Sequence, residues 1–158
     1  MHILLNRMKR PFPQLNFQPY TFEDVKRIAE KERINLTICD YDDDVLGYYC
    51  TRKTEKQTKK FIVINQKLDE INRTFVGLHE LAHHFLHIPA SARQWLYCSR
   101  NANRIHAKND CEANSFALIA MIPLWMMIDL DATGYQDIDP VLMKFCIQRK
   151  KLWEKFAL

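Results

Sequence analysis

The residues most suited to chemistry lie in one short segment, His79-Glu80-Leu81-Ala82-His83, which has the pattern HExxH. Residues four apart lie one turn from each other on the same face of a helix, so His79 and His83 can direct both imidazoles at one metal ion. Glu80 lies beside them, where its carboxylate can take a proton from a water molecule on the metal. The pattern therefore predicts a metal-dependent hydrolytic site, with the two histidines as ligands and Glu80 as general base.

The surrounding sequence favours a helix with one apolar and one polar side. At about 100° per residue, the apolar residues of segment 78–88 fall on one side of a helical wheel and the histidines fall on the other. We therefore expect the helix to bury its apolar side and to present its polar side to a cleft. His84 lies at the edge of the polar arc, and we expect it at the surface. The alternative is a surface helix whose histidine and glutamate side chains are merely solvated.

A catalytic zinc ion keeps three protein ligands and one open position, so a third ligand is needed. His87 lies one turn beyond His83, but three ligands on one straight helix spread over about 12 Å, so we interpret His87 as a neighbour in the cleft. Glu112 is the favoured third ligand, because an apolar helix follows it and a buried carboxylate needs a partner. Two alternatives stay open: Glu112 belongs to the capping box of a helix that begins at Asn109, or Asp110 is the ligand.

Hydrolysis also needs a donor that stabilises the oxyanion together with the metal. The candidates are His87, Tyr97, Arg104 and His106, and the sequence does not distinguish among them. Asn114 is a candidate for orienting a ligand, with an ordinary amide at the edge of the core as the favoured alternative.

Two longer segments carry a resemblance to a known family. HELAHHFLH, followed by EANSFA and then Pro123, resembles the ImmA/IrrE-type zinc metallo-endopeptidases. The similarity covers roughly residues 20–125. Ala82 stands where the family more commonly has glycine, and the segment that ends at Pro123 departs from the usual ending. These differences leave the metal-binding pattern intact.

The resemblance implies a gluzincin-like site in which one zinc ion per chain is held by His79, His83 and Glu112, with Glu80 as general base. It also implies a function in the cytosol. The expected protein substrate is a helix-turn-helix transcriptional repressor that silences a mobile element, a prophage or a stress response.

Two other classes of function are alternatives. The first is a catalytically silent metal-binding interaction protein, such as one partner of a toxin–antitoxin-like pair, but the intact Glu80 favours the enzyme. The second is a nucleic-acid binder that uses the basic segments 52–60 and 144–155. The formal net charge of +4 is mild for that class, so we expect no direct nucleic-acid partner.

Composition excludes further classes. The three glycines exclude the glycine-rich loops that bind phosphates. The five cysteines are odd in number and contain no CxxC pair, which indicates reduced thiols in the cytoplasm. The longest nearly apolar run, residues 116–128, contains Pro123 and is shorter than the ~20 residues that span a bilayer. We therefore expect a cytoplasmic protein without a membrane partner.

Hydrophobic periodicity and turn residues predict the secondary structure. The expected elements are a helix at 22–33, strands at 34–38, 45–51 and 61–64, a helix at 69–87, a helix from Asn109 interrupted at Pro123, and a last helix from Asp139. This order predicts an α+β, zincin-like domain over residues 20–158, in which a small antiparallel β-sheet packs with the HExxH helix and further helices. Residues 1–19 are predicted to be an irregular N-terminal arm. Trp95, Trp125 and Trp153 are expected in the core, and Gly77 is expected to let its helix pack closely against a neighbour.

Overall fold

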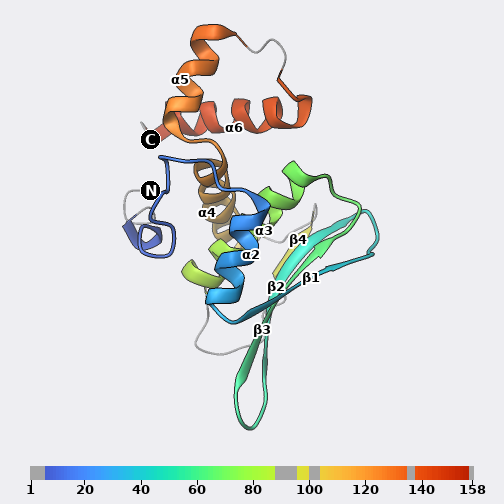
Figure 1. The fold of residues 1–158 in the computed structure, drawn as a ribbon. Coiled ribbons are helices and arrows are strands. Elements are labelled where there is room, and N and C mark those ends of the chain that lie inside the picture. The colour runs from blue at the N-terminus through green and yellow to red at the C-terminus, as the bar shows by residue number, and fades with distance from the viewer. Residues whose placement is uncertain (1–5, 88–95, 100–103, 135–137, 157–158) are drawn as a thin grey trace.

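The computed structural model describes residues 6–87, 96–99, 104–134 and 138–156 (Figure 1). The order of its elements confirms the predicted α+β class, and the predicted boundaries are correct to within a few residues for most elements. The elements are α2 (Phe22–Lys31), β1 (Ile34–Cys39), β2 (Val45–Lys53), β3 (Thr58–Asn65), α3 (Glu70–Leu86), β4 (Leu96–Ser99), α4 (Arg104–Met121), α5 (Leu124–Thr133) and α6 (Pro140–Phe156).

The sheet is mixed, so the expectation of an antiparallel sheet is wrong for one of its pairs. The strand order is β1-β3-β2-β4. β2 pairs antiparallel with β3 and with β4, whereas β1 pairs parallel with β3. β3 forms a hairpin with β2 and lies between β2 and β1, so that it runs in the direction of β1. The local patterns predicted β1, β2 and β3, but they did not predict β4, and they carried no information on which strand occupies the centre of the sheet.

Helix α3 occupies the middle of the domain, packed against α2, α4 and strands β2 and β3. It begins at the N-cap Asp69, whose carboxylate accepts a hydrogen bond of 2.8 Å from the backbone N–H of Asn72. Close packing with α2 occurs at Gly77, where an added Cβ would lie 2.7 Å from Cγ1 of Val25. The structure therefore confirms the expected close approach at this glycine.

The central part of α3 is buried on every side, which overturns the expectation for His84. Only 3% of His84 is exposed, and its Nδ1 lies 2.9 Å from the hydroxyl of Tyr49 on β2. Its Nε2 lies 3.5 Å from the carboxylate of Glu32, at the end of α2. His84 lies inside the domain because the sheet and α2 cover the side of α3 that a helical wheel assigned to solvent.

Two other expectations about burial and capping are wrong. Trp125 and Trp153 are 54% and 37% exposed, so these two side chains are not core anchors; Trp95 lies outside the described residues. Helix α4 begins at Arg104, five residues before Asn109. Glu112 therefore lies well inside a helix, and its proposed place in a capping box at Asn109 is excluded.

Part of the predicted N-terminal arm joins the core. Residues 6–8 are helical and the chain then makes a series of turns. The ring of Phe12 is fully buried and makes edge contacts with Tyr20, Phe85 and Phe116, at centroid distances of 5.3, 5.7 and 4.7 Å. This segment thus packs against α3 and α4, while a domain boundary at residue 19 stays a prediction.

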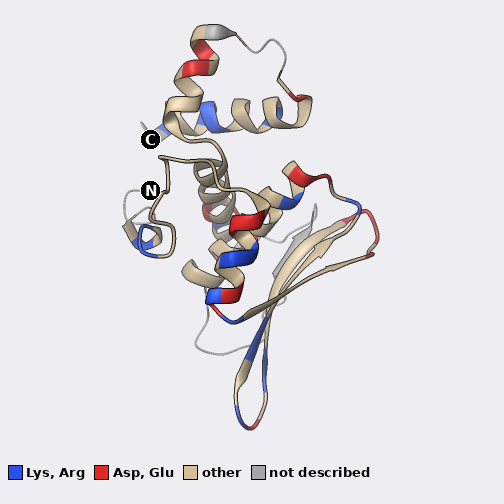
Figure 2. Ribbon diagram, viewed as in Figure 1, with Lys and Arg blue, Asp and Glu red and all other residues tan. Residues whose placement is uncertain are grey.

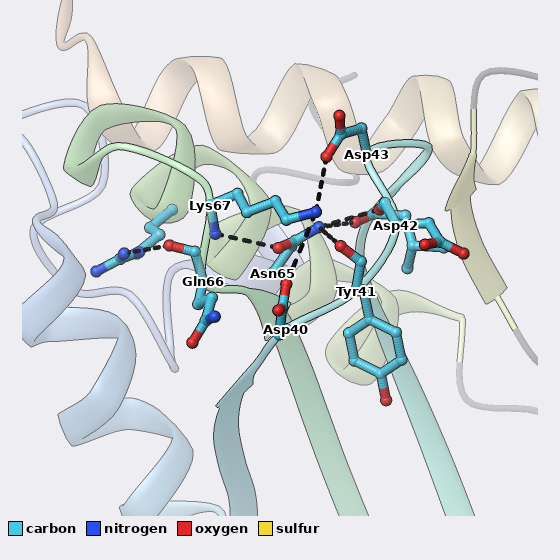
Figure 3. A network of polar contacts seen from close by, with 9 residues as sticks. Asp40, Tyr41, Asp42, Asp43, Asn65, Gln66 and Lys67 are labelled. Atoms are coloured by element: carbon cyan, nitrogen blue, oxygen red, sulfur yellow. Dashed lines mark hydrogen bonds and ion pairs between the residues drawn. The ribbon is translucent and has the colours of Figure 1, made fainter.

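The loop between β1 and β2 carries an acidic run, residues 40–44, which is held by contacts at the end of β3 (Figure 3). The side-chain amide of Asn65 donates to the backbone carbonyls of Tyr41, Asp42 and Val45 at 3.2, 3.1 and 2.9 Å. The ammonium of Lys67 lies 3.0 Å from the carboxylate of Asp43. These contacts fix the loop that aligns the first strands of the sheet.

Basic residues are grouped on the part of the β2–β3 hairpin that projects beyond the rest of the sheet (Figures 1 and 2). They are Arg52, Lys53, Lys56 and Lys59, and all four are exposed. The hairpin tip therefore contributes charge at the surface and does not contribute to the core.

Cys39, Cys50, Cys111 and Cys146 are free thiols. Among the described residues, no single helix is long and apolar enough to cross a membrane, and one bent pair, Lys108–Met121 with Leu124–Ala132, meets that test by length and composition alone.

Candidate active site

Helices α3 and α4 bring two imidazoles and a carboxylate together. His79, His83 and Asp110 each offer one ligand atom, and these atoms all lie within 4.8 Å of one another. The Nε2 atoms of His79 and His83 are 2.9 Å apart, and Oδ1 of Asp110 lies 3.3 Å from Nε2 of His83. Both histidines are 1% exposed. The i, i+4 spacing of α3 therefore forms one half of this cluster, and α4 supplies the other half.

The orientation of His79 is set by Asn114. Nδ1 of His79 lies 2.8 Å from Oδ1 of Asn114. Because an amide oxygen only accepts hydrogen bonds, Nδ1 carries the proton and donates it, and Nε2 presents its lone pair to the cluster. Burial lowers the pKa of His79 to about 4, and the imidazole is therefore neutral near pH 7. A neutral imidazole with a free lone pair is the form that binds a metal ion.

Glu80 is fully buried beside the two histidines. Neither of its carboxylate oxygens has a hydrogen-bond partner in the described structure. Burial raises the pKa of Glu80 well above its ordinary value, and the charge of Asp110 adds to the shift, while the backbone of Tyr49 opposes it. A carboxylate in this environment binds a proton readily, as a general base in a hydrolase must.

Glu112 and Asp110 occupy different positions relative to the two histidines. Asp110 and Asn114 are four residues apart on one face of α4, and both contact the histidines of the HExxH segment. Oε2 of Glu112 instead lies 3.1 Å from Nε2 of His87. The structure thus brings Asp110, the alternative ligand, next to His83. The assignment of Glu112 as ligand stays a prediction.

His87 is the C-cap of α3 and contacts His83 twice. Its backbone N–H donates to the carbonyl of His83 at 3.0 Å, and the Nδ1 atoms of the two rings are 3.1 Å apart. The other candidates for oxyanion stabilisation are described only through their backbone. Tyr97 pairs with Tyr48 at the edge of the sheet, and His106 lies in the first turn of α4 after Arg104. The described part of the structure does not include the side chains of these candidates.

Sequence reasoning did not assign two of these relationships. The contact of His84 with Tyr49 and Glu32 depends on the sheet and α2, and no local pattern signals it. The spacing of Asp110 and Asn114 is the same i, i+4 spacing as that of His79 and His83. When two packed helices both carry polar residues at this spacing, each polar residue of one helix can contact one residue of the other. This spacing is the signal in the sequence that favours Asp110 as the ligand.

Comparison with known proteins places the cluster in a family. The sequence matches the peptidase M78 family, described as an IrrE N-terminal-like domain, over residues 29–150. The chain belongs to this family. The matched range includes all of α3 and α4, and with them every residue of the cluster. The predicted resemblance to the ImmA/IrrE group is therefore confirmed, and membership implies a peptidase type of function.

The peptidase M78 domain is also similar to a phage protein. An "uncharacterized immunity region protein 2" of Bacillus phage phi105 is 29% identical over 124 residues, which cover 78% of this chain and 74% of the phage protein.

Proposed function

We propose that this chain is a zinc-dependent endopeptidase, with one zinc ion held by His79, His83 and a carboxylate of α4. The observation that carries the proposal is the convergence of two imidazole Nε2 atoms and the Asp110 carboxylate within 4.8 Å. The fully buried carboxyl group of Glu80 is on the same helix, directly after His79. Membership of a peptidase family supports the same activity.

The donor set fits a catalytic zinc site. Two nitrogens and one carboxylate oxygen are three protein ligands, and they leave a fourth position for substrate. Two ligands about 2.0–2.1 Å from a tetrahedral zinc ion are about 3.3 Å apart, close to the 2.9 Å between the Nε2 atoms of His79 and His83. The lone pair on Nε2 of His79 faces Nε2 of His83, and the carboxylate of Asp110 lies beside them. A cation between these three groups would stabilise the arrangement. We take Asp110 as the third ligand and Glu112 as the alternative.

Different residues of the chain carry out different parts of the proposed reaction. When bound, zinc would supply Lewis acidity, which polarises the scissile carbonyl and lowers the pKa of water towards neutrality. Glu80 accepts the proton of the attacking water on its carboxylate and then delivers it to the nitrogen of the leaving amine. Burial raises the pKa of Glu80, which favours its uptake of the proton from water. Asn114 keeps His79 in the tautomer whose Nε2 is free to bind.

We further propose that the substrate is a helix-turn-helix repressor of a mobile element, prophage or stress response. The similarity to a phage protein named for an immunity region supports a substrate from such a system. The cytoplasmic location and the lack of a direct nucleic-acid partner belong to the same proposal.

The test uses the purified full-length chain with one equivalent of zinc and a repressor encoded near its gene. Wild type, Glu80→Gln and Glu70→Gln are compared by mass spectrometry of the products. Glu70 is an exposed glutamate in the first turn of the same helix, so Glu70→Gln is the matched control. We expect cleavage by wild type and by the control, and a loss of about 10²–10⁴-fold for Glu80→Gln.

Equal cleavage by Glu80→Gln would contradict the mechanism. Tight binding of the repressor by wild type without any cleavage would instead favour the catalytically silent interaction protein.

A further inference from the structure

We propose that Glu112 and His87 are positioning residues, which hold His83 in the tautomer that presents Nε2 to the metal. This inference rests on the metal site of the proposed function and assigns Glu112 a role other than ligand. It predicts that the two residues act as a pair, through His83 and without contact to substrate.

Glu112, His87 and His83 form a row of contacts, and the direction of each hydrogen bond in it follows from the carboxylate of Glu112. Glu112 is 3.1 Å from Nε2 of His87, and an ionised carboxylate only accepts, so Nε2 of His87 carries the proton. Neutral His87 then has its lone pair on Nδ1, which lies 3.1 Å from Nδ1 of His83. When a cation lies between Nε2 of His83 and Asp110, Nδ1 of His83 is the donor across this contact, and the lone pair of His83 is on Nε2. Without a cation, the carboxylate of Asp110, 3.3 Å from Nε2, competes for the same proton. With the cation present, the row of contacts ends with the acceptor atom directed at His79 and Asp110.

The placement of His87 depends on the end of α3. As C-cap, His87 has left the helical conformation, yet its backbone N–H still donates to the carbonyl of His83. One turn of the same helix therefore links the two rings through both backbone and side chain. Glu112 comes from α4, so the packing of α3 against α4 completes the row.

The two ligand histidines are then oriented by equivalent means. His79 donates to the amide oxygen of Asn114 on α4, and His83 donates through His87 to Glu112 on α4. A hydrogen bond to the far nitrogen fixes the ring of a ligating histidine, and a carboxylate at the end of the row raises its basicity. Since Oε2 of Glu112 is engaged by His87, the position beside His83 is left to Asp110.

The experiment measures zinc affinity of the full-length protein at pH 7 by competition with a chromophoric chelator, without any substrate. The variants are Glu112→Gln, Glu112→Ala, His87→Ala and Asp110→Ala, with Glu30→Ala on α2 as a control for the loss of an exposed glutamate. Far-UV circular dichroism checks that each variant is folded. Glutamine keeps an oxygen that accepts from His87, whereas alanine removes the acceptor.

We expect Glu112→Ala and His87→Ala to weaken zinc binding by about 10–100-fold while one zinc still binds at saturation. Glu112→Gln should fall between wild type and Glu112→Ala, and Asp110→Ala should abolish stoichiometric binding. The ¹⁵N chemical shifts of the His83 ring in the zinc-free protein should show a larger share of the tautomer protonated on Nδ1 in wild type than in Glu112→Ala.

Three outcomes would overturn the inference: an unchanged zinc affinity in Glu112→Ala, a complete loss of zinc in both Glu112 variants, or an unchanged His83 tautomer. None of these measurements depends on peptide cleavage. A repressor that resists cleavage while the affinities follow the expected order would contradict the proposed function alone.

Discussion

Asn114 on α4 accepts a hydrogen bond of 2.8 Å from Nδ1 of His79 on α3, and this contact joins the two helices at the cluster of His79, His83 and Asp110. The two residues are 35 positions apart in the chain. The bond decides which nitrogen of His79 faces the cluster, so a side chain far from the HExxH segment controls the chemistry of its first histidine.

Replacing Asn114 by leucine removes the acceptor while keeping the branch at Cγ and the number of side-chain heavy atoms. We expect zinc affinity to fall by about 10–100-fold, because His79 loses the partner that fixes its tautomer. Asn114→Asp retains an oxygen acceptor and should remain within a few-fold of wild type. Chelator competition measures both, and equal affinities for the leucine and aspartate variants would contradict the role of this hydrogen bond.

Zinc should stabilise the folded chain through Asp110. A ligand that binds only the native state adds about 2.7 kcal/mol at a concentration of 100 times its Kd, so the melting temperature of the chelator-treated protein should rise when zinc is restored. Asp110→Ala should lose most of this rise, whereas Asp44→Asn, which changes an exposed carboxylate in the loop between β1 and β2, should keep it. Differential scanning calorimetry provides the comparison, and a full rise in Asp110→Ala would exclude Asp110 as a ligand.

Gly77 and Val25 should behave as a coupled pair. A Cβ on Gly77 would lie 2.7 Å from Cγ1 of Val25, so Gly77→Ala should destabilise the protein by about 1–3 kcal/mol. Val25→Ala removes both opposing methyl groups, Cγ1 and Cγ2, and leaves a cavity. The double variant should be less destabilised than the sum of the two single variants, because the new methyl occupies that cavity. Urea unfolding of the four proteins gives the coupling energy, and strict additivity would show that the helices adjust independently.

Asp69 should make the stability of the N-terminal end of α3, the HExxH helix, depend on pH. Hydrogen bonding to the backbone N–H of Asn72 lowers the pKa of Asp69 below its ordinary value of 3.8. A group whose folded pKa is lowered stabilises the fold above its unfolded pKa, and this stability is lost as the pH falls through the folded pKa. We expect Asp69→Ala to cost about 1 kcal/mol at pH 7, a typical value for loss of an N-cap.

The pH dependence separates the charge of Asp69 from its geometry. Asp69→Asn keeps a capping oxygen without the charge, so its deficit relative to wild type should shrink as the pH falls below 3.8. Urea unfolding at pH 7 and at pH 3 measures this change. A deficit that is constant with pH would show that the ionised carboxylate contributes nothing to the cap.

Local patterns in the sequence determined most of the elements, though not β4 or the start of α4, and the first half of the site. Helix α3 was predictable because its apolar residues recur with the helical period, and HExxH placed His79 and His83 on one face at a fixed spacing. The strands of the hairpin were predictable from their β-branched and aromatic residues. These features depend on neighbours within a few residues along the chain.

Only the tertiary structure decided which distant groups meet. It placed β3 between β1 and β2, buried His84 against Tyr49, and brought Asp110 to His83 while Glu112 met His87. Asp110 and Glu112 are both acidic and only two residues apart, so the composition of their segment does not separate them. They are distinguished by their different directions around the axis of α4 and by the packing of α4 on α3. A ligand or a hydrogen-bond partner must lie within about 3 Å, and the sequence alone does not place side chains at that precision.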